Sequence, residues 1–168
     1  MASINIAGTV NDSIVDGEGY RFTIFTQGCP HHCKGCHNPH THEFSRGKIV
    51  DTNDLFADIC ENKLLSGVTF SGGEPFCQPA PLADLGCKLK KEGLDIWIYT
   101  GYTLEALHAM HNKDVEALLT VADVLVDGKF ILAKRDLTLS FRGSSNQRLI
   151  DLNETRKAGK IVLKNLDI

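Results

Sequence analysis

The stretch "RFTIFTQGCPHHCKGC", residues 21–36, joins a short apolar segment to three closely spaced cysteines. Residues 21–27 are rich in aromatic and β-branched side chains and end at a glycine, a pattern that predicts a β-strand. Cys29, Cys33 and Cys36 follow directly, spaced four and then three residues apart. We therefore expect a strand that delivers a loop of thiolates at its carboxyl end.

Beyond this stretch, strand and helix patterns alternate along the chain. Strands separated by amphipathic helices predict right-handed βαβ crossovers and a parallel sheet. Four such units are enough for part of an eight-stranded barrel or for an open curved sheet. The predicted strands are residues 21–27, 67–73, 94–101 and 123–128. The predicted helices are residues 51–67, 79–93 and 103–110, the last of which is continued or restarted at 113–122.

After residue 128 the alternation weakens. The segments "LTLSF" (137–141), "RLIDL" (148–152) and "KIVLK" (160–164) are strand-like, and "NETRKAG" (153–159) reads as a helix or turn. The chain of 168 residues has 42% hydrophobic content, which suits one core rather than two. We expect residues 1–168 to form a single domain.

The charge and the cysteine content limit the classes of function. A formal net charge of -3 provides no overall basic field for a nucleic acid or an anionic membrane, so we expect neither as a partner. No signal peptide and no long apolar run are present, which predicts a soluble cytoplasmic protein. In a reducing cytosol cysteines serve as ligands or packed thiols rather than disulfides. We expect Cys60, Cys77 and Cys87 to be packed as small apolar residues.

Unusual residues lie directly after four consecutive predicted strands. The clustered cysteines follow the first strand, and "GGEP" (72–75), "TGY" (100–102) and "DGK" (127–129) follow the next three. In parallel α/β folds the carboxyl ends of the strands line the ligand site. These four segments should therefore converge on one face of the sheet.

The three clustered thiolates predict either zinc or an iron–sulfur cluster. A structural zinc ion usually takes four ligands, and the fourth would come from His31, His32, His37 or another cysteine. A short loop with three thiolates also holds three corners of a cubane cluster and leaves the fourth iron open for a substrate. We interpret the histidines as loop residues rather than ligands.

The segment "SGGEP" (71–75) supplies a second indication of a ligand. Its two glycines let the backbone approach a ligand closely, and Glu74 adds a carboxylate that can pair with an amine. Beside an open iron, this segment indicates a ligand that carries both an amino group and a carboxylate.

The CxxxCxxC motif at 29–36, followed by GGEP at 72–75, resembles the radical S-adenosylmethionine (radical SAM) superfamily. More narrowly, "SIVDGEGYRFTIFTQGCPHHCKGCHNP", "WIYTGYT", "DVLVDGKF" and "FRGSSNQRLIDL" are similar to the activating components of anaerobic ribonucleoside-triphosphate reductases. The resemblance implies a partial (β/α) barrel of the radical SAM type, with a mostly parallel curved sheet and outer helices.

The same resemblance implies the cofactors and the partner. Cys29, Cys33 and Cys36 would be the metal ligands and catalytic cysteines, holding a 4Fe–4S cluster whose fourth iron binds S-adenosylmethionine. One electron from a flavodoxin- or ferredoxin-type donor would cleave the cofactor, and the 5′-deoxyadenosyl radical would take hydrogen from a glycine in the large reductase subunit. The alternatives are an activase of another glycyl-radical enzyme (pyruvate formate-lyase type), a small-molecule radical SAM enzyme or a zinc-binding module.

Further residues are assigned to the site by resemblance. Longer activases often have an acid where this chain has Tyr99, and this difference argues against a monovalent cation site. Two interpretations remain for residues 16–21, a structural turn or a contact with the partner. Residues 142–148 likewise form either a structural turn or a contact with the cofactor or the partner. The residues expected to bind the cofactor are Gly35, Gly72, Gly73, Glu74, Thr100, Asp127 and Lys129.

Overall fold

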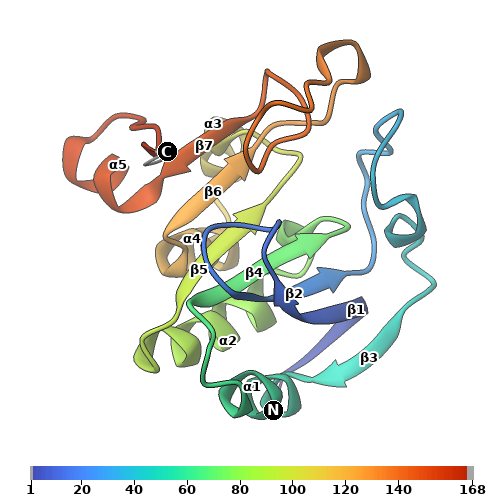
Figure 1. Cartoon of the computed structure of the whole chain (residues 1–168), viewed down its shortest axis with the longest axis vertical. Helices are drawn as coiled ribbons and strands as arrows, with labels where there is room; N and C mark the ends of the chain where they lie inside the picture. The colour runs from blue at the N-terminus through green and yellow to red at the C-terminus, as the bar shows by residue number, and fades with distance from the viewer. Residues whose placement is uncertain (1, 166–168) are drawn as a thin grey trace.

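A computed structural model describes residues 2–165 and contains a seven-stranded open sheet with the order β3-β1-β2-β4-β5-β6-β7 (Figure 1). The strands are β1 (Ser3–Ser13), β2 (Arg21–Thr26), β3 (Lys48–Asp51), β4 (Gly67–Gly72), β5 (Asp95–Tyr99), β6 (Val124–Asp127) and β7 (Arg148–Asp151). The α-helices are α1 (Thr52–Glu61), α2 (Pro79–Lys91), α3 (Leu104–Ala109), α4 (Lys113–Val121) and α5 (Leu152–Ala158).

The centre of the sheet is parallel, as the alternating pattern predicts. Strands β2, β4, β5 and β6 pair in parallel, with helices in the connections after β4 and β5. Helices α1, α2 and α4 lie together behind one face of the sheet (Figure 1). The core between them includes Ile24, Phe70, Ile98 and Leu125, all fully buried. The expected α/β class with an open, partly parallel sheet and outer helices is confirmed.

Antiparallel strands flank this centre, and two of them, β1 and β3, were not predicted. β1 lies between β2 and β3 and is antiparallel to both. Its buried Ile4 and Ile6 alternate with more exposed residues, which is the sequence signal for a strand that covers a core on one face. Ile6 pairs with both Thr26 and Lys48. The segment between them, residues 27–47, is called the cysteine loop below.

The last part of the chain departs partly from the prediction. Residues 148–152 form β7 and the start of α5, and residues 153–159 continue that helix. The strands expected at 137–141 and 160–164 are wrong: β7 takes the place beside β6, and residues 160–164 make only an isolated bridge to β7. Residues 137–141 instead belong to an irregular loop closed by a bridge between Arg135 and Ser144, and the 160–164 segment contributes one bridge at Leu163.

The dispersed cysteines are less buried than expected. Cys60 is partly buried, but Cys77 and Cys87 are exposed, so the expectation of packing is wrong for these two. Cys77 ends the short 3-10 helix η2 (Pro75–Cys77), and Cys87 lies on α2 away from its buried Leu85 and Leu89. Among the described residues, every helix is too short or too polar to cross a membrane.

Candidate metal and cofactor site

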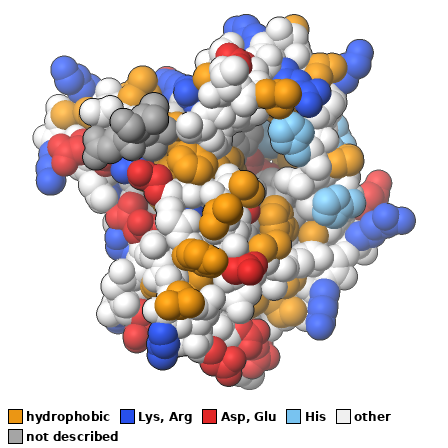
Figure 2. Space-filling view, viewed as in Figure 1, with side chains coloured by type: hydrophobic (Ala, Val, Ile, Leu, Met, Phe, Trp, Pro, Cys, Tyr) orange, Lys and Arg blue, Asp and Glu red, His pale blue; other side chains and the backbone are white. Residues whose placement is uncertain are grey.

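A cavity of about 730 Å³ lies at the carboxyl ends of the parallel strands. Each of the four predicted strand-end segments contributes to its lining, so the expected convergence is confirmed. In Figure 2, histidine side chains gather on the side of the molecule where Figure 1 places the cysteine loop. The predicted segments contribute Cys29, Cys33, Cys36, Gly72, Gly73, Thr100, Gly101 and Gly128 to the lining.

The three clustered cysteines all line this cavity. Cys29 is buried, whereas Cys33 and Cys36 are half-buried. Cys36 N donates to Cys33 O at 3.1 Å, which folds the end of the motif into a turn. Burial raises the pKa of the Cys29 and Cys33 thiols, and the nearby Glu74 carboxylate raises that of Cys29 further. Metal binding at these sulfur atoms must therefore release protons.

The donor set fits an iron–sulfur cluster. Three thiolates on one loop and in one cavity are the soft ligands that such clusters take. Over residues 2–165, no three Cys, His, Asp or Glu side chains are grouped as ligands of one metal ion. The thiolates of a cubane bind different irons, so they stand farther apart than the ligands of one ion do. Cys29, Cys33 and Cys36 are thus the residues that would hold a cluster.

The Gly72–Gly73 turn lies against the start of the cysteine loop. Gly73 N donates to Thr26 O at 3.0 Å, and Glu74 N donates to Gly28 O at 2.8 Å. Gly72 has a φ of +112°, and a Cβ on it would overlap the backbone of Thr26. Only glycine allows this close approach, which brings the turn to the cavity wall.

Replacing Gly72 with Ala should lower the free energy of unfolding by at least about 2 kcal/mol, because the positive φ and the overlap with Thr26 both add strain. Urea denaturation measures this change. Gly8→Ala is the control, since a Cβ there meets no atom within 4 Å, and we expect it to stay within about 0.5 kcal/mol. Equal stability of the two variants would contradict the strain.

Glu74 lies behind the cavity wall rather than in its lining. The side chain is fully buried, and its carboxylate accepts from Phe76 N at 3.0 Å, from Thr100 Oγ1 at 2.8 Å and from Gly101 N at 2.8 Å. His31 Nε2 lies 2.7 Å from the same carboxylate. Protein donors therefore surround the group that the sequence assigned to a ligand amine, and contact between Glu74 and a ligand stays a prediction.

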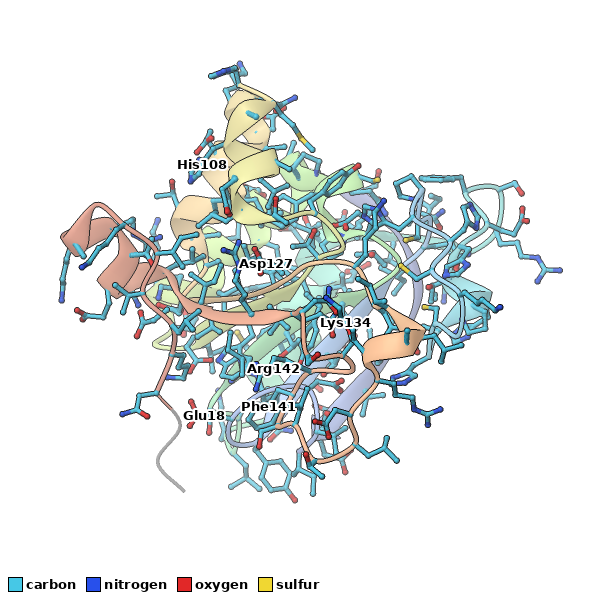
Figure 3. All side chains as sticks on the ribbon, turned by 90° about the horizontal axis from the view of Figure 1, so that it is seen from above. Glu18, His108, Asp127, Lys134, Phe141 and Arg142 are labelled. Carbon is cyan, nitrogen blue, oxygen red and sulfur yellow. The ribbon has the colours of Figure 1, made fainter. Side chains whose placement is uncertain are left out.

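The strand-end acid Asp127 also lies outside the cavity lining. It is buried and accepts from Leu104 N at 2.9 Å, at the start of α3. Arg148 Nε donates to it at 3.0 Å. Figure 3 shows Asp127 between the ribbons of α3 and β7, which these bonds join. A structural role for Asp127 is thus explained by its contacts, and cofactor binding by it stays a prediction.

The other residues that were expected to bind the cofactor also differ in whether they line the cavity. Lys129 is exposed, and Gly35 faces the side chains of Phe130 and Leu132. Thr100 lines the cavity while its hydroxyl bonds Glu74. Of the residues expected to bind the cofactor, the cavity lining includes Gly72, Gly73 and Thr100, and it excludes Gly35, Glu74, Asp127 and Lys129.

Several lining residues were not predicted as site residues. The loop after β6 contributes Phe141 and Arg142, both labelled in Figure 3. Asp16 comes from the β1–β2 connection, and Tyr99 ends β5. Burial and the nearby Asp16 carboxylate raise the pKa of Tyr99 well above its usual range. For Asp16 and Arg142 the available signals were the motifs at 16–21 and 142–148, whereas Phe141 and Tyr99 lie outside both.

The motif at 16–21 is anchored by Arg21, whose guanidinium is fully buried. Arg21 donates to Thr69 Oγ1 at 2.7 Å and to Glu18 O at 2.9 Å. Its Nη2 also lies 2.6 Å from the Asp95 carboxylate. Thr69 Oγ1 in turn donates to Asp16 O at 2.7 Å. This network ties the motif to β4 and β5 and places Asp16 at the cavity, which supports a structural turn there.

An open α/β sheet whose first parallel strand leads into a loop of three cavity-lining cysteines carries a donor set that suits an iron–sulfur protein. Residues 15–150 match the family described as "4Fe-4S single cluster domain". The chain is 41% identical over 143 residues to the anaerobic ribonucleoside-triphosphate reductase-activating protein of Vibrio cholerae, covering 80% of this chain and 89% of that protein. Proteins with the same description from Haemophilus influenzae and Escherichia coli are 38% and 36% identical, covering 80% of this chain and 89% and 90% of theirs.

The chain belongs to the family of anaerobic ribonucleoside-triphosphate reductase-activating proteins. The resemblance drawn from the sequence motifs is thereby confirmed. Among solved structures, the crystal structure of QueE from Escherichia coli is similar, with a TM-score of 0.46 and 25% identity, covering 60% of this chain and 53% of that one.

Proposed function

We propose that this protein generates a glycyl radical on the large subunit of an anaerobic ribonucleoside-triphosphate reductase, using a 4Fe–4S cluster and S-adenosylmethionine. One observation carries the proposal: the three cysteines and the Gly72–Gly73 turn line the same cavity. The family relatives, named as activating proteins of this reductase, support the choice of partner. Held by the three cysteines, a reduced cluster would supply the electron for cleavage of S-adenosylmethionine, and the bound cofactor would supply the radical chemistry that removes hydrogen from the partner's glycine.

In this proposal the residues of the chain bind the cluster, orient the cofactor and shield the reacting groups from water. Cys29, Cys33 and Cys36 would hold the cluster with three thiolates, which would leave one of its four irons free for the cofactor. The Gly72–Gly73 backbone forms a wall that a ligand can approach closely. The cavity encloses the reacting groups, and this positions the bond to be broken and limits quenching by water. An electron donor of the flavodoxin or ferredoxin type completes the system.

Electron paramagnetic resonance tests the proposed function. Anaerobically reconstituted and reduced protein, mixed with S-adenosylmethionine and the large reductase subunit, should give a glycyl-radical signal in the reductase. A reductase variant whose radical glycine is replaced by alanine is the control and should give no such signal. A signal obtained only with a pyruvate formate-lyase type enzyme would refute the partner, and colourless protein that holds zinc instead of iron would refute the function.

A further inference from the structure

One histidine of the cysteine loop differs from its neighbours in burial. His31 lies between Cys29 and Cys33, and only 6% of its side chain is exposed. By contrast, His32 and His40 on the same loop are exposed. All the histidines of this loop were expected to be loop residues rather than ligands. The structure separates His31 from them.

The His31 ring is held on several sides by segments outside the cysteine loop. Its Nε2 lies 2.7 Å from Oε1 of Glu74. A carboxylate can only accept, so Nε2 donates this hydrogen bond. The ring meets Tyr102 edge-on with 4.5 Å between centroids. It also packs on the backbone of Gly101, where a Cβ would overlap the imidazole.

The carboxylate that His31 contacts joins three parts of the cavity wall. Glu74 belongs to the Gly72–Pro75 segment, and its Oε1 also accepts from Thr100 Oγ1 and Gly101 N, both at 2.8 Å, in the segment after β5. Through His31 the cysteine loop becomes the third segment at this carboxylate. Because Glu74 is fully buried, these donors replace water around its charge.

We propose that His31 is a positioning residue that fixes the first half of the cysteine motif against the Gly72–Gly73 turn. The proposal rests on the proposed function: the cluster is bound by the cysteines, and the cofactor's amino and carboxylate groups must reach the turn while they bind the open iron. A loose connection between loop and turn would vary that span and weaken binding. The hydrogen bond from His31 to Glu74 fixes the distance between the cysteine loop and the turn.

Two other roles for His31 predict different contacts or different results. A metal ligand would bind through Nδ1, the ring nitrogen that the bond to Glu74 leaves free, and its removal would lower the iron content, whereas removal of a positioning residue would leave the cluster in place. A placeholder, which leaves Glu74 when the cofactor's amine arrives, would compete with the cofactor. Removing a placeholder would tighten cofactor binding, whereas removing a positioning residue would weaken it.

The test compares cluster-loaded His31→Leu, His31→Gln and native protein under anaerobic conditions. S-adenosylmethionine affinity is measured by the change that it causes in the resonance spectrum of the reduced cluster. We expect binding about tenfold weaker in His31→Leu, the effect of losing one hydrogen bond to a charged group. His31→Gln keeps an amide donor and should restore most of the affinity. The control, His40→Gln, changes an exposed histidine outside the cavity lining and should bind as the native protein does.

A second measurement is independent of the cofactor. Hydrogen exchange of residues 28–36, in cluster-loaded protein without S-adenosylmethionine, should be faster in His31→Leu and native-like in His31→Gln. Unchanged exchange, or native or tighter cofactor binding in His31→Leu, would overturn the positioning role. If native protein failed to bind S-adenosylmethionine, the proposed function would fail, while the exchange rates would still decide whether His31 fixes the loop.

Discussion

Replacing Cys33 with Ala should remove both the cluster and the cleavage of S-adenosylmethionine. Cys33 lines the cavity with Cys29 and Cys36, and two thiolates cannot hold the cluster that three hold. Iron analysis after anaerobic reconstitution should fall from about four irons per chain to near none. Production of 5′-deoxyadenosine, followed by chromatography, should fall below detection.

Cys87→Ala is the matched control for this experiment. Cys87 is an exposed thiol on α2 and does not line the cavity, so its loss should change neither iron content nor cleavage. The comparison separates loss of a ligand from loss of a thiol. Cleavage at the native rate in Cys33→Ala would show that the assigned ligand set is wrong.

Arg21→Ala should lower the free energy of unfolding by about 3 kcal/mol, because it removes a fully buried side chain and leaves buried hydrogen-bond acceptors without their donor. Arg21 is fully buried, and it bonds Thr69, the Glu18 carbonyl and the Asp95 carboxylate. Its guanidinium also lies 5.4 Å from the centre of the Trp97 ring. The substitution leaves these groups without their donor and opens a gap beside the ring.

Urea denaturation of the cluster-free protein measures this effect. Arg46→Ala provides the comparison, because Arg46 is exposed and its hydrogen bonds within the described residues come from its backbone, which the substitution keeps. We expect that variant to stay within about 0.5 kcal/mol of the native protein. A similarly small effect of Arg21→Ala would mean that the motif at 16–21 is held by other contacts.

The sequence predicts the parallel centre of the fold because its strands are apolar runs bounded by glycine. Residues such as Phe70 and Ile98 are buried where those runs lie. The convergence of the cysteines with Gly72 and Thr100 follows from topology alone, since parallel strands end on one edge. The parallel strands and the meeting of their ends can thus be predicted without knowing any side-chain contact.

Other features depend on long-range contacts that local patterns do not encode. Pairing of β1 with β3 brings together residues 3–6 and 48–51, on opposite sides of the cysteine loop. The bond from His31 to Glu74 spans 43 positions, so neither residue shows its partner in the sequence. Residues 137–141 alternate like a strand, but the place beside β6 is taken by β7.

The double pairing of Ile6 has a consequence for maturation of the protein. Thr26 and Lys48, the residues on either side of the cysteine loop, both pair with Ile6 of β1. The entropy of bringing the two ends of this long loop together is thus offset by strand pairing, not by iron. The two ends of the cysteine loop are therefore already held together before iron and sulfide bind. Metal binding then has to order only the residues between those ends.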